Sequence, residues 1–485
     1  MIEFFSQLHP GTIFLLCFSL FLVLFFEFIN GFHDTANAVA TVIYTQAMQP
    51  WHAVLLSGVF NFLGVVSGGL AVAYAIVNLL PVDLLASGDS RHLIAMILAM
   101  LAGAIMWNLG TWYFGLPASS SHTLIGAIIG VGMTNALLTH DSFTHGINWG
   151  KAADVGMSLL FSPLLGFAIA FFMLTGIKRM LPRANIHQTP YLRSGVRGKK
   201  HPPFWTRFLL IISAGGVSFA HGSNDGQKGV GLAMLALICL LPSHFLINVN
   251  ADRYQLERSL HASQQLAAFA NDHAAWIQTA FPLEPVAAGV EHCQVADISS
   301  RAAAVTKQIS AHPTVGQMNT EDRWQLRRDL LCLNTTAKML AAGNHTDKAQ
   351  KTYLSELRRD FTKPVEYAPL WVIIAIASAL GLGTMIGWKR VVKTVGEGIG
   401  RSHMTYAQGV SAQLTAAISI AGANLFGLPV STTQILSSAV AGTAVANKSG
   451  LRGSTIRNIL LAWLFTFPVA MLLSGLLYYA ITLFL

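Results

Sequence analysis

Long apolar stretches constrain the fold of this chain more than any other feature of its sequence. A run of about 20 apolar residues is long enough to cross a lipid bilayer as a helix. Runs that reach or approach this length lie at residues 12–29, 53–80, 93–112, 156–177, 208–241, 367–388 and 456–485. Only 11% of the 485 residues are charged, against about a quarter in an ordinary soluble protein. We therefore expect an all-α polytopic membrane protein whose main partner is the lipid bilayer.

The charged residues are unevenly distributed between the apolar runs. Residues 178–207 contain eight basic residues and no acidic one, which nearly accounts for the net charge of +9 and leaves no sign of nucleic-acid binding. Basic loops remain on the cytoplasmic side of a membrane, so we expect this loop to be cytoplasmic. One crossing through 208–241 then places residues 243–363, which hold almost half of all charged residues, on the periplasmic side.

Two motifs occur twice in the same order. Residues 30–37 (NGFHDTAN) and 114–123 (FGLPASSSHT) in the first half correspond to 221–228 (HGSNDGQK) and 426–434 (FGLPVSTTQ) in the second. Asp34 and Pro117 are 83 positions apart, Asp225 and Pro429 are 204 apart, and the difference of 121 is the length of 243–363. This indicates an internal duplication with an insert. Since the basic loop lies between the copies, we expect inverted-topology repeats with broken or re-entrant helical hairpins.

The expected organisation has five parts. They are a first transmembrane repeat (1–177), a basic cytoplasmic loop (178–207), the start of the second repeat (208–242), a mostly helical extramembrane insert (243–363) and the rest of the second repeat (364–485). The insert contains Cys293 and Cys332, and a disulfide between them is compatible with a periplasmic location. The spacing of the two cysteines leaves the pairing open.

The duplicated Asp34 and Asp225 are the strongest candidates for a functional role. An ionised carboxylate in hydrocarbon is costly, and such residues normally face a polar cavity, a cation or a proton path. An isolated aspartate could simply fix helix packing, but occurrence at matching positions of two repeats favours function. We expect cation or proton coupling by these residues and by polar neighbours, namely Glu27, His33, Asn37, His122 and Asn224.

The segments after Pro117 and Pro429 are rich in hydroxyl side chains. Proline suits the first turn of a helix, hydroxyls cap its amides, and a helix start attracts anions. Two such starts from opposite faces would surround a tetrahedral oxyanion. We expect inorganic phosphate, with sulfate as the alternative. The candidate ligands are Lys228, which could equally be a permanent partner of Asp225, and Ser119, Ser120, Ser121, Ser431, Thr432 and Thr433.

Other classes of protein fit the pattern less well. Ser119 and His122 share a helix face, which raises the possibility of an intramembrane serine hydrolase. The second copy has Gln434 in place of the histidine, however, and the sequence contains no nucleophile turn of the Gly-x-Ser-x-Gly type at these motifs. A passive channel remains an alternative, but duplicated broken helices around charged residues favour alternating access.

These motifs resemble those of the bacterial low-affinity inorganic phosphate transporters of the Pit family, which are related to the sodium–phosphate symporters. The resemblance extends over essentially the whole chain, through both signature segments and both Pro-hydroxyl segments. It implies uptake through the bacterial inner (plasma) membrane by proton symport, with phosphate partly moving as a neutral complex with a divalent metal. It implies no permanently bound cofactor and leaves a homodimer possible. Sodium-coupled phosphate symport is the alternative.

The sequence departs from the family pattern at three positions. The first copy has His33 where the signature typically has asparagine, and the second copy keeps Asn224. Lys228 replaces the asparagine that corresponds to Asn37, and Gln434 replaces the histidine that corresponds to His122. The loss of an asparagine favours proton coupling over a sodium cage.

Overall fold

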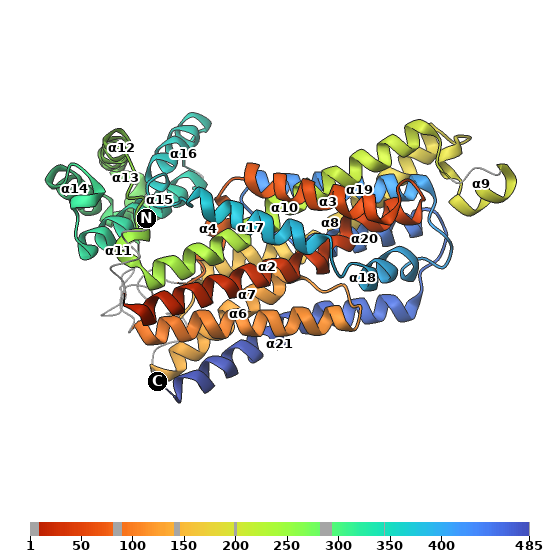
Figure 1. The fold of residues 1–485 in the computed structure, drawn as a ribbon. Coiled ribbons are helices and arrows are strands. Elements are labelled where there is room, and N and C mark those ends of the chain that lie inside the picture. Colours follow the sequence, from red (N-terminus) through yellow and green to blue (C-terminus); the bar gives the residue numbers. More distant parts are fainter. Residues whose placement is uncertain are drawn as a thin grey trace. The chain divides into compact units, whose positions relative to one another are not determined.

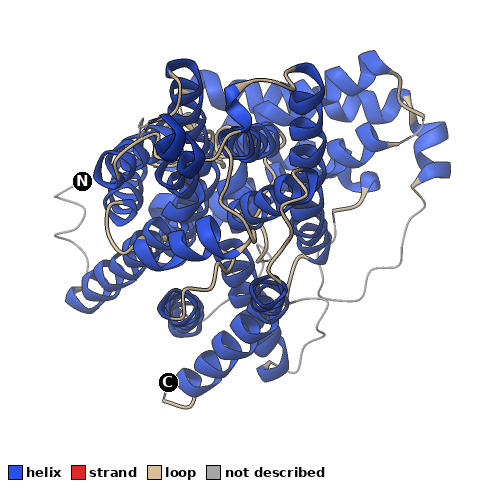
Figure 2. Cartoon of the chain, turned by 90° about the vertical axis from the view of Figure 1, so that its right-hand side faces the viewer, coloured by secondary structure: helices blue, strands red, loops and turns tan. Residues whose placement is uncertain are grey.

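The computed structural model describes residues 9–80, 90–139, 146–197, 201–281, 293–343 and 345–484. Within these ranges the regular elements are helices (Figure 2), apart from an isolated β-bridge between Gly400 and Leu451. The expected all-α class is confirmed. The chain divides into two compact units, one formed by Met1–Leu84, Gly88–Ala236 and Ala368–Leu485, and one formed mainly by Leu237–Tyr367.

The first unit contains the long apolar helices. Its elements are α2 (Pro10–Tyr44), α3 (Pro50–Ser67), α4 (Ala71–Val77), α6 (Ser90–Tyr113), α7 (Ser120–Leu138), α8 (Trp149–Met180), η1 (Asn185–His187), α9 (Pro190–Arg197) and α10 (Phe204–Leu240). After the second unit it continues with α17 (Leu370–Thr384), α18 (Lys389–Lys393), the π-helix η4 (Thr394–Gly398), α19 (Tyr406–Leu425), α20 (Thr432–Ala446) and α21 (Gly453–Thr482).

Within the described ranges, six helices are long and apolar enough to cross a membrane, namely α2, α3, α6, α7, α8 and α21. A seventh span would combine α17 with the segment 389–396, bent by 57°. The apolar run 53–80 contains the span α3, which ends at Ser67, and the seven-residue α4 follows as a separate helix. The polar motif 221–228 lowers the mean hydropathy of the 37-residue α10, which is not among the six.

The two halves pack in corresponding ways. Helices α6 and α7 lie side by side with α21 (Figure 1), whereas α19 and α20 pack against α8. Glycines allow close contact at matching positions. A Cβ on Gly130 of α7 would overlap the carbonyl of Met471 on α21, and a Cβ on Gly442 of α20 would overlap that of Phe167 on α8. The helical hairpin α6–α7 therefore packs on α21 of the second half, and the hairpin α19–α20 packs on α8 of the first half. This arrangement is consistent with duplication.

The second unit is a cluster of helices. They are α11 (Pro242–Phe245), α12 (Arg253–Asp272), α13 (Ala274–Ala280), η2 (Val295–Asp297), α14 (Ile298–Ala311), η3 (Val315–Gln317), α15 (Thr320–Ala342) and α16 (Lys348–Thr362). The buried Arg327 of α15 donates to the carbonyls of Leu246 and Val365, and so ties together the two ends of the unit. Cys293 and Cys332 are joined by a disulfide, the pairing that the sequence left open.

Candidate functional site

Helices α7 and α20 begin with the same local structure. Gly115 (φ 65°) and Gly427 (φ 63°) adopt a left-handed backbone at the turn before each helix, which glycine does without a steric penalty. The hydroxyls of Ser119 and Ser431 then accept hydrogen bonds from the amides three residues later and cap the helices. Both serines are buried. Two capped helix starts inside the protein favour a bound anion, because their dipoles present positive ends.

The carboxylate of Asp34 in α2 is bonded by both halves of the chain. Thr433 Oγ1 donates to it at 2.6 Å and Ser120 Oγ donates at 3.3 Å. The Nδ1 atom of His33 lies 3.2 Å from the same carboxylate. Asp34 is buried, and these partners offset the cost of removing its charge from water. Since Thr433 belongs to α20, the contact joins the first half to the second.

Asp225 in α10 is held in a similar way. Its Oδ1 lies 2.5 Å from the Nζ of Lys228, one turn later, and its Oδ2 accepts a hydrogen bond from Thr432 at 3.2 Å. Lys228 Nζ also donates to Ser121 Oγ at 2.5 Å and to the carbonyl of Val430 at 3.1 Å. All five residues are buried. Lys228 therefore connects Asp225 to the starts of both α7 and α20.

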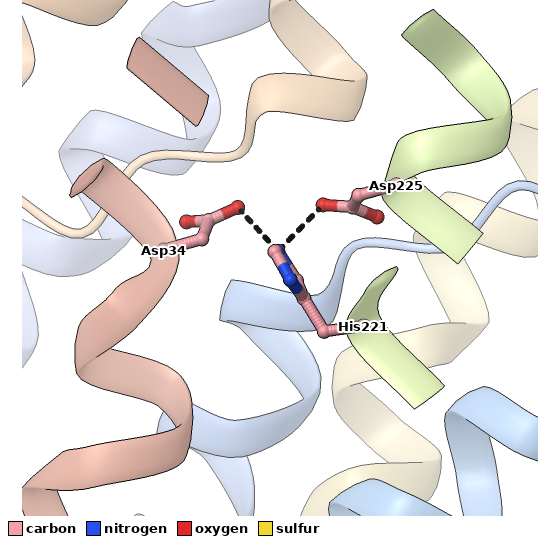
Figure 3. Close-up of side chains that lie close together, drawn as sticks. All are labelled: Asp34, His221 and Asp225. Carbon is pink, nitrogen blue, oxygen red and sulfur yellow. Dashed lines mark ion pairs between the residues drawn. The ribbon is translucent and has the colours of Figure 1, made fainter. Parts of the chain in front are cut away.

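His221 lies between the two aspartates (Figure 3). Its Nε2 atom is 3.2 Å from Asp225 Oδ2 and 3.6 Å from Asp34 Oδ2, and both contacts are buried. One ligand atom from each of the three residues lies within 4.8 Å of the other two. Two carboxylates and an imidazole at this separation could hold one cation, and they are ligand types that first-row transition metals accept.

The hydrogen bonds around Asn61 assign the proton on His221. Thr384 Oγ1 donates to the carbonyl of Leu380 at 2.8 Å, and so it accepts from Asn61 Nδ2 at 2.9 Å. The amide oxygen of Asn61 then faces His221 Nδ1 at 2.9 Å, which must be the donor. A lone pair on Nε2 would consequently face two carboxylates. A proton or a metal cation among the three groups removes this repulsion.

Asn224 forms its described side-chain hydrogen bonds with residues around the start of α20. Its Nδ2 donates to Asn424 Oδ1 at 2.5 Å and to the carbonyl of Leu428 at 3.2 Å. Its Oδ1 accepts from the amide of Val430 at 3.4 Å. Asn224 thus bonds the segment that precedes α20, and its side chain forms no described hydrogen bond with Asp34 or with its chain neighbour Asp225. These bonds fix the position of the start of α20, and a role of Asn224 in coupling stays a prediction.

The remaining predicted residues lie around the centre. His122 is partly buried and its Nδ1 lies 2.8 Å from Ser119 Oγ, beside the cap of α7. Glu27 is fully buried in α2 and accepts a hydrogen bond from Asn30 at 3.3 Å. The side chain of Asn37 lies outside the described residues. Neither His122 nor Glu27 forms a described hydrogen bond with Asp34 or Asp225.

Sequence reasoning missed His221 and Asn61 as site residues. A signal for His221 was present, because it precedes Asp225 by four positions, and residues at this spacing share one face of a helix. Asn61 is a polar residue within an apolar run. Its contact with His221 joins α3 to α10, and a pairing of that kind depends on tertiary packing that a local pattern does not encode.

Comparisons with known proteins find similarity over nearly the whole chain. The profile of the phosphate transporter family (PHO4) matches residues 30–474. The chain is 49% identical to the low-affinity inorganic phosphate transporter PitB of Escherichia coli (strain K12), with 99% of each chain covered. It is 45% identical to the low-affinity inorganic phosphate transporter of Buchnera aphidicola subsp. Acyrthosiphon pisum, with 100% of each covered. A solved structure described as the sodium-dependent phosphate transporter has the same fold, with a TM-score of 0.53 at 20% identity over 97% of this chain and 100% of that one.

Proposed function

Because the chain belongs to the phosphate transporter family, we propose that it imports inorganic phosphate across a bacterial plasma membrane by proton symport. It is a multi-pass membrane transporter and not an enzyme. The orientation that we propose has residues 178–207 on the cytoplasmic side and the unit Leu237–Tyr367 on the periplasmic side. The positive-inside rule supports this orientation.

One observation supports the phosphate site more than any other. Lys228 connects the Asp225 carboxylate with Ser121 at the start of α7 and with the carbonyl of Val430 just before α20. Two helix starts and a buried cation thus meet at one place. Phosphate there would receive hydrogen bonds from hydroxyls and first-turn amides, and would share the charge of Lys228 with Asp225.

The charge of the site supports proton coupling. With neutral histidines, the buried ionisable groups Glu27, Asp34, Asp225 and Lys228 would together carry a net negative charge. An added phosphate anion would increase that charge in a medium where unpaired charge is expensive. Protons that arrive with the phosphate lower this cost. The candidate acceptors within the site are the buried carboxylates and His221, whose Nε2 faces both aspartates.

The same three groups suggest a place for a metal that moves with the phosphate as cargo. Asp34, His221 and Asp225 could bind a divalent cation, and the neighbouring hydroxyls of Ser120 and Thr432 could bind the phosphate attached to it. A neutral metal–phosphate complex would cross with less electrostatic cost than the free dianion. A metal cation or protons would then be alternative ways to offset the negative charge of the phosphate and the two aspartates.

The acceptors in this site favour phosphate over sulfate. Monohydrogen phosphate has an O–H group that can donate to Asp34 or Asp225, whereas sulfate at neutral pH has none. Sulfate would therefore bring an additional acceptor to a place already rich in carboxylate oxygens, and specificity often depends on such a mismatch. The matching packing of α6–α7 and α19–α20 supports two inverted repeats that alternate around this site.

Transport by the purified protein in proteoliposomes tests the proposal. Uptake of radiolabelled phosphate is measured while the pH gradient, sodium and magnesium are varied independently, with unlabelled sulfate as competitor. We expect accumulation above equilibrium that needs an inward proton gradient, continues without sodium and is insensitive to sulfate. Accumulation that requires sodium would support sodium symport, and equilibration without accumulation would support a channel. Inhibition by equimolar sulfate would support a general oxyanion permease.

A further inference from the structure

Glu27 is a third buried carboxylate of the membrane unit, and its surroundings differ from those of the two aspartates. Glu27, Asn30 and Asp34 occupy one face of α2, since they are separated by one and then about one more turn of helix. Glu27 and Asp34 are both essentially inaccessible to solvent. The two carboxylates therefore share a helix, a face and a similar degree of burial, and differ mainly in the partners they have.

Those partners are few for Glu27. Its Oε2 accepts one hydrogen bond, from Asn30 Nδ2 at 3.3 Å, and its Oε1 is buried without a hydrogen-bond partner. The Oδ1 of Asn30 is likewise buried and unpartnered. Among the described side chains, no cation lies within ion-pair distance of Glu27. Asp34 and Asp225, by contrast, each have two hydroxyl, imidazole or ammonium partners or more.

The contrast has a consequence for the charge of Glu27. A buried carboxylate needs several donors or a cation to offset its desolvation, and a neutral carboxylic acid needs far less. One amide donor is insufficient for a fully buried anion at membrane depth. A proton on Glu27 Oε1 would remove the charge from a carboxylate whose Oε1, like the neighbouring Asn30 Oδ1, is buried without a hydrogen-bond partner.

A glycine provides the space for this carboxyl group. A Cβ on Gly229 of α10 would lie 2.4 Å from Glu27 Cγ and 2.6 Å from its Oε1. Gly229 directly follows Lys228, so the carboxyl group of Glu27 packs against the part of α10 that carries Asp225 and Lys228 of the proposed phosphate site. The charged and titratable groups that act on Glu27 across this packing are Asp225, Lys228 and His221, all on α10.

We propose that Glu27 carries the symported proton, at a position separate from the aspartates that surround the phosphate. The proposal rests on proton symport as the proposed function. An O–H bond forms at Glu27 Oε1 when a proton arrives from the outer aqueous phase, and the same bond breaks when the proton leaves to the inner phase. Once ionised, Glu27 attracts Lys228 away from Asp225 and Ser121. The contacts of Lys228 at the phosphate site weaken as the proton departs.

Replacement of Glu27 by glutamine tests this role, because an amide has the shape of the protonated acid and does not titrate. In proteoliposomes, Glu27→Gln should still exchange external radiolabelled phosphate for internal phosphate. It should fail to accumulate phosphate under an inward proton gradient, where one coupled proton per phosphate gives about tenfold accumulation per pH unit. Glu356→Gln, at an exposed position of the second unit, is the matched control and should behave as the wild type.

Further variants separate the proposal from a folding defect and from the proposed function. Glu27→Asp keeps a titratable group and should retain accumulation with a shifted pH profile. Asp34→Asn should lose exchange as well as accumulation. Three outcomes would each overturn the role of Glu27. They are accumulation of phosphate by Glu27→Gln equal to that of the wild type, loss of exchange in this variant, and loss in this variant of a sodium requirement that the wild type shows. If the wild type itself shows no proton-driven accumulation, the proposed function fails whatever Glu27 does.

Discussion

At the scale of single residues, the structure distinguishes carboxylates that composition alone would group together. Asp34 and Asp225 are surrounded by hydroxyl, imidazole or ammonium partners, whereas Glu27 has one amide donor. In a medium that cannot hydrate ions, the number of donors decides whether a carboxylate is stable as an anion. This difference is the basis of the roles proposed above, in which the two aspartates organise the phosphate site and Glu27 carries the proton.

Neutralisation of either aspartate should abolish net uptake. Asp34→Asn removes the charge that His33, Ser120 and Thr433 surround, and Asp225→Asn removes the partner of Lys228. We expect initial rates of radiolabelled phosphate uptake at background level, with the protein still present in the membrane by immunoblot. The exposed Asp272→Asn should transport normally. Normal accumulation by an Asp34 or Asp225 variant would remove that residue from the mechanism.

Removal of one hydroxyl from each half should weaken phosphate binding. Ser120→Ala and Thr432→Ala each delete a donor, and a lost contact to a buried polar group costs about 1–3 kcal/mol. Each substitution should therefore raise the half-saturation concentration for uptake roughly tenfold. Thr175→Ala, which deletes an exposed hydroxyl of α8, is the control. An unchanged half-saturation concentration in both variants would place the phosphate elsewhere.

The sequence named most residues of the centre but not their pairing. Duplication brought out Asp34, Asp225 and the hydroxyl segments, and the structure brings them together. The duplication did not show that Thr433 donates a hydrogen bond to Asp34 in the other half, because the two residues are 399 positions apart. His221 was missed since a single histidine on a helix has many structural explanations. Periodicity describes one helix face, whereas a contact between helices depends on packing.

At the scale of elements, backbone contacts between helices fix the position of the hairpins. Gly130 and Gly442 lie at equivalent places in α7 and α20, and each lets its helix approach a carbonyl on a long helix of the other half. Small residues at such contacts are typical of membrane helix packing. The sequence predicted both helix starts from proline and hydroxyl residues, but did not predict that α3 and α4 would be separate.

A methyl group at either glycine should therefore destabilise the protein. In Gly130→Ala the new Cβ would overlap the Met471 carbonyl, and in Gly442→Ala it would overlap that of Phe167. Overpacking of this kind costs about 1–3 kcal/mol, and we expect a lower midpoint of thermal unfolding in detergent. Gly176→Ala, in a helix with open space around the glycine, should be neutral or slightly stabilising. Equal midpoints for all three variants would contradict the packing.

At the scale of the whole molecule, the account depends on two units with different surroundings. The membrane unit follows from apolar runs and the helical second unit from charge distribution, both readable in the sequence. The unit found at Leu237–Tyr367 is a few residues wider on each side than the expected 243–363. It includes the last turn of α10, and Arg327 ties Leu246 to Val365 near its other end. Such side-chain ties leave no compositional signal.

The proposed sidedness can be measured in intact cells. In a background with Cys17 and Cys239 replaced by serine, Ser194→Cys in α9 and Ser355→Cys in α16 introduce exposed thiols in the basic loop and the second unit. A membrane-impermeant maleimide should label Ser355→Cys from outside and should label Ser194→Cys only after the membrane is opened. The reverse pattern would invert the topology, and labelling of both from outside would place the two segments on the same side.

The central claim is that the two halves of the chain together form one phosphate site. The number of phosphate ions that bind to each chain tests this claim most directly. Equilibrium binding of radiolabelled phosphate to the purified protein should give one site per chain. Ser120→Ala in the first half and Thr432→Ala in the second should each weaken that same site, and their effects should be non-additive in a double-mutant cycle. Two independent sites per chain, with each substitution affecting only one of them, would contradict the account.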